Sequence, residues 1–201
     1  MQSSRLKKGK PPFFLDLDET IICSVDSSEY DPKDPKQKAK ADKLHSVDMD
    51  DYYKVFKRPG LDRFLDYLFD NFTVSVWTAA TRDYAAFIVD KIILTKPSRA
   101  LDWIFFSYHC DISEDTKGPT KDLDMLTDEF GLPKAYKSAV ILDDNEGVQK
   151  AQPGRCINAK PFDFADEGVE RDTFLIQLIP KLALVKSAML AGSKSPAQPA
   201  N

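Results

Sequence analysis

Short apolar segments alternate with segments of helical periodicity along most of this chain, and this order constrains the fold more than any other feature. Short apolar runs are typical of buried strands, which we predict at residues 13–15, 73–77, 104–108 and 139–142. Strands separated by helices need crossover connections, which are right-handed and place helices on both faces of a mainly parallel sheet. The sequence therefore predicts an α/β fold of the Rossmann-like type.

The helices between these strands are predicted from apolar periodicity. In residues 61–72 the apolar side chains recur at the i, i+3, i+4 and i+7 spacing of an amphipathic helix. Further helices are expected at residues 83–94, 121–131 and 172–189. The glycine that ends the second of these three suits a left-handed C-cap, and Pro180 predicts a break or a kink in the last one.

The two ends of the chain differ in composition from its middle. Residues 1–10 are polar and basic, and residues 191–201 are small, polar and proline-containing. Such segments bury too little apolar surface to offset the entropy lost on ordering, so both are expected to be disordered tails. A single domain is expected over residues 11–190, because a chain of 201 residues builds one sizeable core.

The expected domain carries only small insertions. Residues 26–43 are rich in lysine, aspartate and proline, which predicts an exposed loop. Residues 52–57 predict one arm of a hairpin, with residues 44–47 as its partner. No segment is long enough to form a large cap over the sheet.

Charge, cysteine usage and hydropathy exclude several classes of protein. There are 28 basic and 32 acidic residues, a balance that does not favour a general nucleic-acid binder. The three cysteines are widely spaced and form neither a disulfide framework nor a zinc motif. No apolar run reaches the roughly 18 residues of a membrane span, and no secretion signal is visible. We therefore expect an intracellular protein, cytoplasmic or nuclear, without a membrane segment.

Polar side chains follow three of the predicted strands at the points where the strands end. Asp16 and Asp18 follow the first strand, Thr78 follows the second, and Asp143 and Asp144 follow the fourth. The carboxyl ends of parallel strands lie at one edge of the sheet, where open α/β folds bind their ligands. These side chains are therefore expected to line one crevice.

Two carboxylates two residues apart can divide a phosphoryl transfer between them. Asp16 can attack phosphorus and form an acyl phosphate, which splits one difficult displacement into two easier ones. Asp18 can protonate the leaving oxygen and later take a proton from the attacking water. The pair predicts hydrolysis of phosphate monoesters through an aspartyl-phosphate intermediate.

The negative charges of the nucleophile and the phosphate require a cation between them. A hard divalent ion held by oxygen ligands suits this task, and Mg2+ fits best. Asp16, the backbone carbonyl of Asp18 and Asp144 are the predicted protein ligands. Thr78 and Lys121 are the predicted partners of the phosphoryl oxygens, since this chemistry depends on positioning and electrostatics.

With these motifs together, the chain resembles the haloacid dehalogenase superfamily and, within it, the small phosphatases that act on the C-terminal domain of RNA polymerase II. The resemblance covers most of residues 11–180. Its motifs are Phe14-Leu15-Asp16-Leu17-Asp18-Glu19-Thr20, Lys57-Arg58-Pro59-Gly60, Trp77-Thr78-Ala79-Ala80-Thr81, Thr120-Lys121-Asp122-Leu123 and Ile141-Leu142-Asp143-Asp144-Asn145.

The resemblance implies a role for each site residue. It makes Asp16 the nucleophile and Asp18 the acid and base. The other assignments are Thr78, Ala79 and Lys121 for phosphate binding, Asp144 with Asp16 and Asp18 for the metal, and Asp143, Thr20 and Asn145 as supporting residues. An alternative role for Asp143 is to orient Lys121.

Simpler interpretations of single residues stay open at this point. Asp16 and Asp18 could cap a helix or face water, and Thr78 could cap the helix that follows it. Lys121 could be an ordinary surface lysine in the first turn of a helix, and Arg82 could contact substrate or only solvent.

Three functions are compatible with the motifs. A phosphatase acting on phosphoserine or phosphothreonine in proteins or peptides is favoured, because no large cap separates the motifs. A phosphatase for nucleic-acid ends or nucleotides is the alternative, motivated by the basic N-terminus and the lysines of residues 26–43. A non-catalytic scaffold is the third, although the chain keeps the acids that catalysis needs. The oligomeric state is left open.

Overall fold

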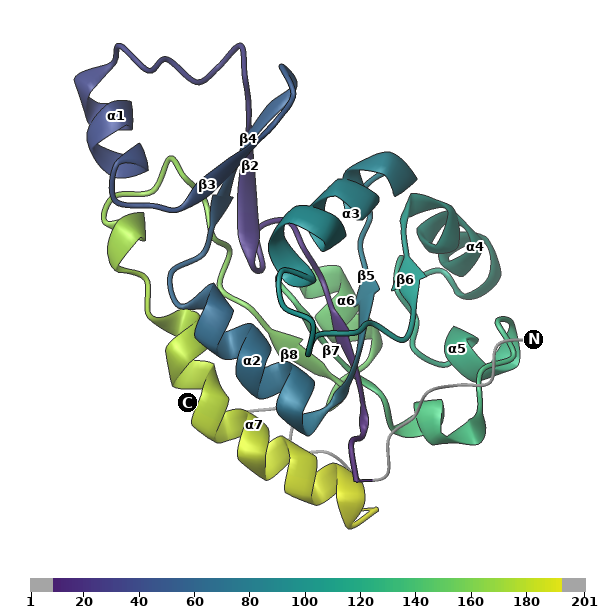
Figure 1. Cartoon of the computed structure of the whole chain (residues 1–201). Coiled ribbons are helices and arrows are strands. Elements are labelled where there is room, and N and C mark those ends of the chain that lie inside the picture. Colours follow the sequence, from purple (N-terminus) through teal and green to yellow (C-terminus); the bar gives the residue numbers. More distant parts are fainter. Residues whose placement is uncertain (1–8, 193–201) are drawn as a thin grey trace.

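Five parallel strands form the central sheet of the protein, seen in a computed structural model that describes residues 9–192 (Figure 1). The strands lie in the order β6-β5-β1-β7-β8, with β1 in the middle. Their bounds are β1 Pro12–Leu15, β5 Thr73–Trp77, β6 Ile104–Phe105, β7 Val140–Asp143 and β8 Cys156–Asn158. The predicted α/β fold with a mainly parallel sheet is confirmed. The sequence did not predict β8, and β6 is shorter than expected.

Helices cover both faces of this sheet, as its alternating side chains require. In β1, Phe13 and Leu15 point to one face, where they join the core formed with α2, α3 and α7, while Phe14 points to the other. The helices of the first face are α2 Leu61–Asn71, α3 Arg82–Ile88 with its π-helical extension Val89–Ile93, and α7 Phe174–Leu190. Those of the second face are α4 Ser107–Lys117, α5 Met125–Asp128 and α6 Glu146–Ala151.

A second, smaller sheet lies beyond the carboxyl end of β1 (Figure 1). Its antiparallel strands are β2 Ile22–Asp26, β4 Tyr53–Lys57 and β3 Ser46–Met49, in that order. The predicted hairpin is present as β3 and β4, and β2 is an additional partner. The segment 26–43 is not wholly a loop, because Pro35–Ala41 forms helix α1. Asp34 caps this helix and none of its residues is buried, so the expected exposure of the segment holds.

One predicted helix and the end of one predicted strand were wrong. The helix expected over residues 121–131 is reduced to α5, and Lys121 precedes it in a turn. The strand expected to reach residue 108 gives way to α4, which begins at Ser107. At residues 104–108 the apolar run continues past the end of the strand, and at residues 121–131 polar side chains alternate with apolar ones, so tertiary contacts determine the local conformation in both places.

The last helix continues through its proline. Pro180 lies inside α7, where a break or kink was expected, and its ring is exposed. Buried leucines on both sides of it, Leu178 and Leu182, pack into the core and hold both halves of the helix in place. Shorter helical turns occur at Lys134–Ser138 and Val169–Arg171.

The ends of the chain are described only in part. Residues 1–8 and 193–201, which make up most of the two expected tails, lie outside the described residues. Among the helices that are described, none has both the length and the apolar character needed to cross a bilayer.

Candidate active site

The pairing of β1 with β7 brings two aspartates to the same point at the edge of the sheet. The strands are parallel with Leu15 opposite Leu142, and the ladder continues as the Asp16 backbone N–H donates to the Leu142 carbonyl at 3.0 Å. Asp16 and Asp143 therefore lie next to each other, each one position beyond that leucine pair. Both carboxyl groups are buried.

A lysine from the second face of the sheet joins these carboxylates. The Lys121 Nζ atom donates to Asp16 Oδ1 at 2.6 Å and to Asp143 Oδ2 at 2.8 Å. Burial alone would lower the pKa of Lys121, but the two carboxylates outweigh it and raise the pKa. Burial and the charge of Asp16 raise the pKa of Asp143, against the effect of Lys121. The three side chains form one buried ionic cluster.

The backbone around Lys121 is fixed by a glutamine of the neighbouring helix. Gln152, just after α6, donates from Nε2 to the Lys121 carbonyl at 2.9 Å and accepts from the Leu123 backbone N–H at 3.0 Å. An amide that makes both bonds holds the turn in one conformation. Lys121, which was expected in a helix, therefore lies in a turn that is held by hydrogen bonds to Gln152 at the end of α6.

A third acid and a threonine complete the oxygen-rich side of this cluster. Carboxylate oxygens of Asp16, Asp143 and Asp144 lie within 4.8 Å of one another. The Thr20 hydroxyl is 3.1 Å from Asp16 Oδ2 and 3.0 Å from Asp144 Oδ1, so it bridges the two acids. Carboxylate oxygens at this spacing fit a hard divalent cation. Lys121 binds Asp16 through Oδ1, whereas Thr20 brings the other oxygen of Asp16, Oδ2, close to Oδ1 of Asp144. Asp16 and Asp144 are therefore the side chains better placed to hold one.

The second aspartate of the β1 motif has a different environment. Asp18 contacts the hydroxyl of Tyr84 on α3 rather than a lysine. Burial raises the pKa of Asp18 to about 6, although the Tyr84 hydrogen bond opposes the shift. Asp18 therefore keeps a proton more readily than an exposed aspartate does. Tyr84 lies within the helix predicted over residues 83–94, but nothing in the sequence pattern marks its hydroxyl as part of the site.

A buried arginine ties the turn after β1 to two other segments. Arg58, 1% exposed, donates to the carbonyls of Thr20 at 2.9 Å and Lys160 at 2.8 Å. Its guanidinium also forms a bidentate ion pair with Asp172, which precedes α7. The rings of Phe162 and Phe174 lie close to it, with their centroids 5.4 and 4.4 Å from the guanidinium carbon. Arg58 belongs to the motif Lys57-Arg58-Pro59-Gly60, but nothing in that motif indicates this role.

Thr78 and its neighbours occupy the end of β5. The Thr78 hydroxyl accepts from the Ala80 N–H at 3.0 Å, and Thr78 itself is buried while Ala79 is exposed. Thr81, not Thr78, caps α3 by accepting from the Tyr84 backbone N–H. The alternative that Thr78 is merely a helix cap is therefore wrong.

Asn145 and Arg82 lie at two margins of the same edge. The Asn145 side chain caps α6, and its backbone N–H donates to Asp143 Oδ1 at 2.9 Å. Asn145 thus helps to hold the buried ionic cluster. Arg82 begins α3 and is exposed.

A cavity of about 310 Å³ opens beside Asp18. It is lined by Asp18, Ser24, Tyr53, Ala80, Thr81 and Tyr84. These residues come from the turn after β1, from the small sheet and from the start of α3. The cavity is thus an approach to Asp18 between the two sheets.

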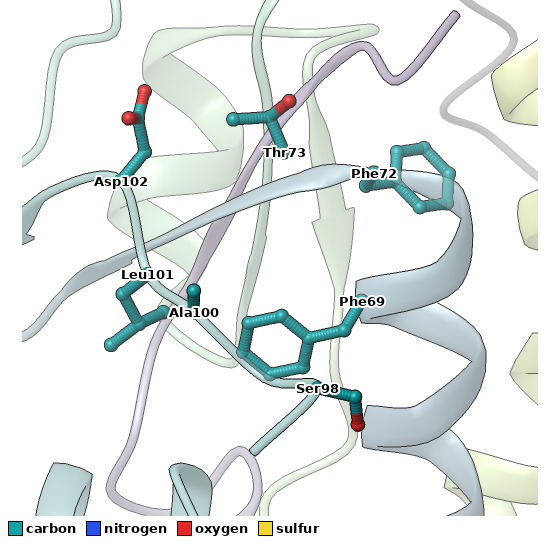
Figure 2. A pocket seen from close by; sticks show the side chains of 7 residues that line it. All are labelled: Phe69, Phe72, Thr73, Ser98, Ala100, Leu101 and Asp102. Atoms are coloured by element: carbon teal, nitrogen blue, oxygen red, sulfur yellow. The ribbon is translucent and has the colours of Figure 1, made fainter. Parts of the chain in front are cut away.

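Another cavity lies at the opposite end of β5 (Figure 2). Its volume is about 30 Å³, and Thr73, the first residue of β5, lines it together with Phe69 and Phe72. It is too small for a phosphate ester and faces away from the acidic cluster. Of these two cavities, the one beside Asp18 is therefore the one that adjoins the site.

Comparisons with known proteins agree with this geometry. The family model of NLI interacting factor-like phosphatases matches residues 13–190. CTD phosphatase-like protein 355R of Invertebrate iridescent virus 3 is 38% identical over 184 residues, covering 88% of this chain and 97% of that protein. CTD nuclear envelope phosphatase 1B of Danio rerio is 30% identical over 171 residues, covering 84% of this chain and 64% of that one.

A solved structure shares the fold. The structure of Fcp1, described as an essential RNA polymerase II CTD phosphatase, superposes with a TM-score of 0.52 at 18% identity. The match covers 92% of this chain and 50% of that one, so this chain spans about half the length of Fcp1 as solved.

The ionic cluster predicts an asymmetric response to removal of its charges. Lys121→Met should lower the free energy of unfolding by about 3 kcal/mol, because two adjacent buried carboxylates lose their cation. Adding Asp143→Asn to that variant should restore part of the loss, since one buried carboxylate then remains. Urea unfolding at pH 7 without divalent cations measures both variants. A double variant no more stable than Lys121→Met would contradict this electrostatic account.

Proposed function

Because this chain belongs to the NLI interacting factor-like phosphatase family, a family of the haloacid dehalogenase type, we propose that it hydrolyses phosphate monoesters through phosphorylated Asp16. The observation that carries the proposal is the contrast between the two acids after β1. Asp16 is paired with the Lys121 ammonium, whereas burial raises the pKa of Asp18 to about 6. Two neighbouring acids in environments that differ in this way are suited to different roles, nucleophile and proton donor.

In the first step an Asp16 oxygen attacks phosphorus. The bond between phosphorus and the leaving oxygen breaks, and the proton of Asp18 passes to that oxygen. In the second step Asp18, now a carboxylate, takes a proton from water as the water oxygen attacks phosphorus. The bond between phosphorus and Asp16 breaks, phosphate departs, and both acids return to their starting protonation.

Three groups of this chain can bind the transferring phosphoryl oxygens. An ammonium has three N–H donors, and Asp16 and Asp143 accept from the Lys121 ammonium, which leaves one donor for a phosphoryl oxygen. The Thr78 hydroxyl accepts from Ala80 and keeps its own hydrogen for another. Ala79, exposed beside Thr78, is the third proposed contact, through its backbone N–H.

We assign the cation as Mg2+, held by Asp16, Asp144 and the backbone carbonyl of Asp18. When bound, Mg2+ neutralises negative charge on the phosphate and the attacking carboxylate. Thr20 supports this arrangement by bridging Asp16 and Asp144. Asp143 serves to hold Lys121 and not the ion.

A phosphorylated protein or peptide is the substrate class that we propose. The relatives are named as CTD phosphatases, and the approach to Asp18 is an open cavity between two sheets. Some of the lysines that motivated a nucleic-acid substrate bind other groups of the protein. Lys40 donates to three backbone carbonyls near Phe164, and Lys38 pairs with Asp42. Faster turnover of an end-phosphorylated oligonucleotide than of a phosphoserine peptide would overturn this substrate assignment.

Asp16→Asn should abolish turnover of a phosphoserine peptide, with a loss of at least about a thousandfold in kcat, because an amide oxygen is a far weaker nucleophile. The matched control is Asp70→Asn on α2, which removes an exposed acid far from the site. Phosphate release with Mg2+ present measures both. Wild-type activity in Asp16→Asn would refute the proposed mechanism.

Removal of the metal should also abolish turnover. A chelator is expected to stop phosphate release, and added Mg2+ should restore it.

Asp144→Asn should weaken Mg2+ binding at least about tenfold, measured by isothermal titration calorimetry in the absence of substrate. Asp70→Asn is again the control. Unchanged Mg2+ affinity in Asp144→Asn would exclude Asp144 as a ligand.

A further inference from the structure

A tyrosine stands between the candidate proton donor and the small sheet. Tyr84 lies in the first turn of α3 and is 8% exposed. Its hydroxyl is hydrogen-bonded to Asp18 Oδ1 and to the Ser24 hydroxyl of β2. One buried phenol thus connects the turn after β1, the small sheet and α3.

The direction of these hydrogen bonds follows from the chemistry of a phenol. A phenol ordinarily loses its hydrogen only at about pH 10, so the Tyr84 hydroxyl has a single hydrogen to donate at neutral pH. If Tyr84 donates that hydrogen to Asp18, it can only accept from Ser24. Ser24 therefore orients the Tyr84 hydroxyl toward Asp18, and the bond to Oδ1 leaves Oδ2 as the oxygen that carries a transferable proton.

The surroundings of Tyr84 hold its ring in place. The ring of Tyr53 in β4 packs edge-on against it, with centroids 5.8 Å apart and planes at 88°. The Thr81 cap fixes the Tyr84 backbone at the start of α3. Asp18, Ser24 and Tyr84 all line the cavity of about 310 Å³, so the leaving group reaches Asp18 from the side of this hydrogen-bonded chain.

We propose that Tyr84 is a positioning residue, which directs Oδ2 of Asp18 toward the leaving oxygen and is itself oriented by Ser24. The inference rests on the proposed function, because it concerns proton transfer by Asp18. Its consequence depends on the leaving group. A serine alkoxide needs a proton as it departs, whereas a nitrophenolate departs readily without one.

The test compares two substrates with the same variants. In Tyr84→Phe the ratio of kcat for a phosphoserine peptide to kcat for p-nitrophenyl phosphate should fall about tenfold. The expected fall is smaller than the whole rate acceleration from general acid catalysis, because Asp18 is still present. Ser24→Ala should lower the same ratio by a smaller factor. The control Tyr67→Phe removes a hydroxyl on α2 and should leave the ratio unchanged. A ratio of rates does not depend on the fraction of folded enzyme.

The outcomes separate this inference from the proposed function. If the wild-type protein hydrolyses neither substrate with Mg2+ present, the proposed function fails and the inference fails with it. If the wild type is active and Tyr84→Phe lowers both rates equally, or lowers neither, the proposed function stands and the positioning role of Tyr84 is refuted.

Discussion

The site depends on one buried ammonium between two buried carboxylates. Asp16 and Asp143 become neighbours because β1 and β7 pair in parallel register, and two adjacent carboxylates in a dry environment repel each other. Lys121 relieves this repulsion by pairing with both carboxylates. It approaches from the second face of the sheet, to which Phe14 and Ile141, two residues before Asp16 and Asp143, also point. The turn that carries Lys121 must therefore approach the sheet, and the bonds to Gln152 hold it there.

Hydrogen bonds of Arg58 and Thr20 link this cluster to distant parts of the chain. Arg58 joins the carbonyl of Thr20 to the segment after β8 and to Asp172 at the start of α7. Thr20 in turn bridges Asp16 and Asp144. Because a buried guanidinium must use its donors, this arrangement also fixes how the small sheet joins the main one. Asp16 and Asp18 thus lie on a segment whose backbone is held by several hydrogen bonds.

The sequence predicted those parts of the structure in which local pattern and tertiary environment agree. Apolar runs that end in acidic residues predicted β1 and β7. The order of the motifs indicated that Asp16, Lys121 and Asp143 would lie close together, and the structure brings them together. The turn around Lys121 was mistaken for a helix, because its conformation depends on Gln152, far along the chain. The part played by Tyr84 was invisible, since helical periodicity reports a buried ring but not the partner of its hydroxyl.

The central claim is that Asp16 carries the phosphoryl group between the two steps, and direct detection of that group tests it most directly. The protein would be mixed with Mg2+ and a phosphoserine peptide, quenched in acid within one turnover, digested and examined by mass spectrometry. The account predicts a gain of one phosphoryl group on the peptide that contains Asp16, and no gain in Asp16→Asn. A phosphoryl group found on another residue, or turnover with no phosphorylated enzyme at any quench time, would contradict it.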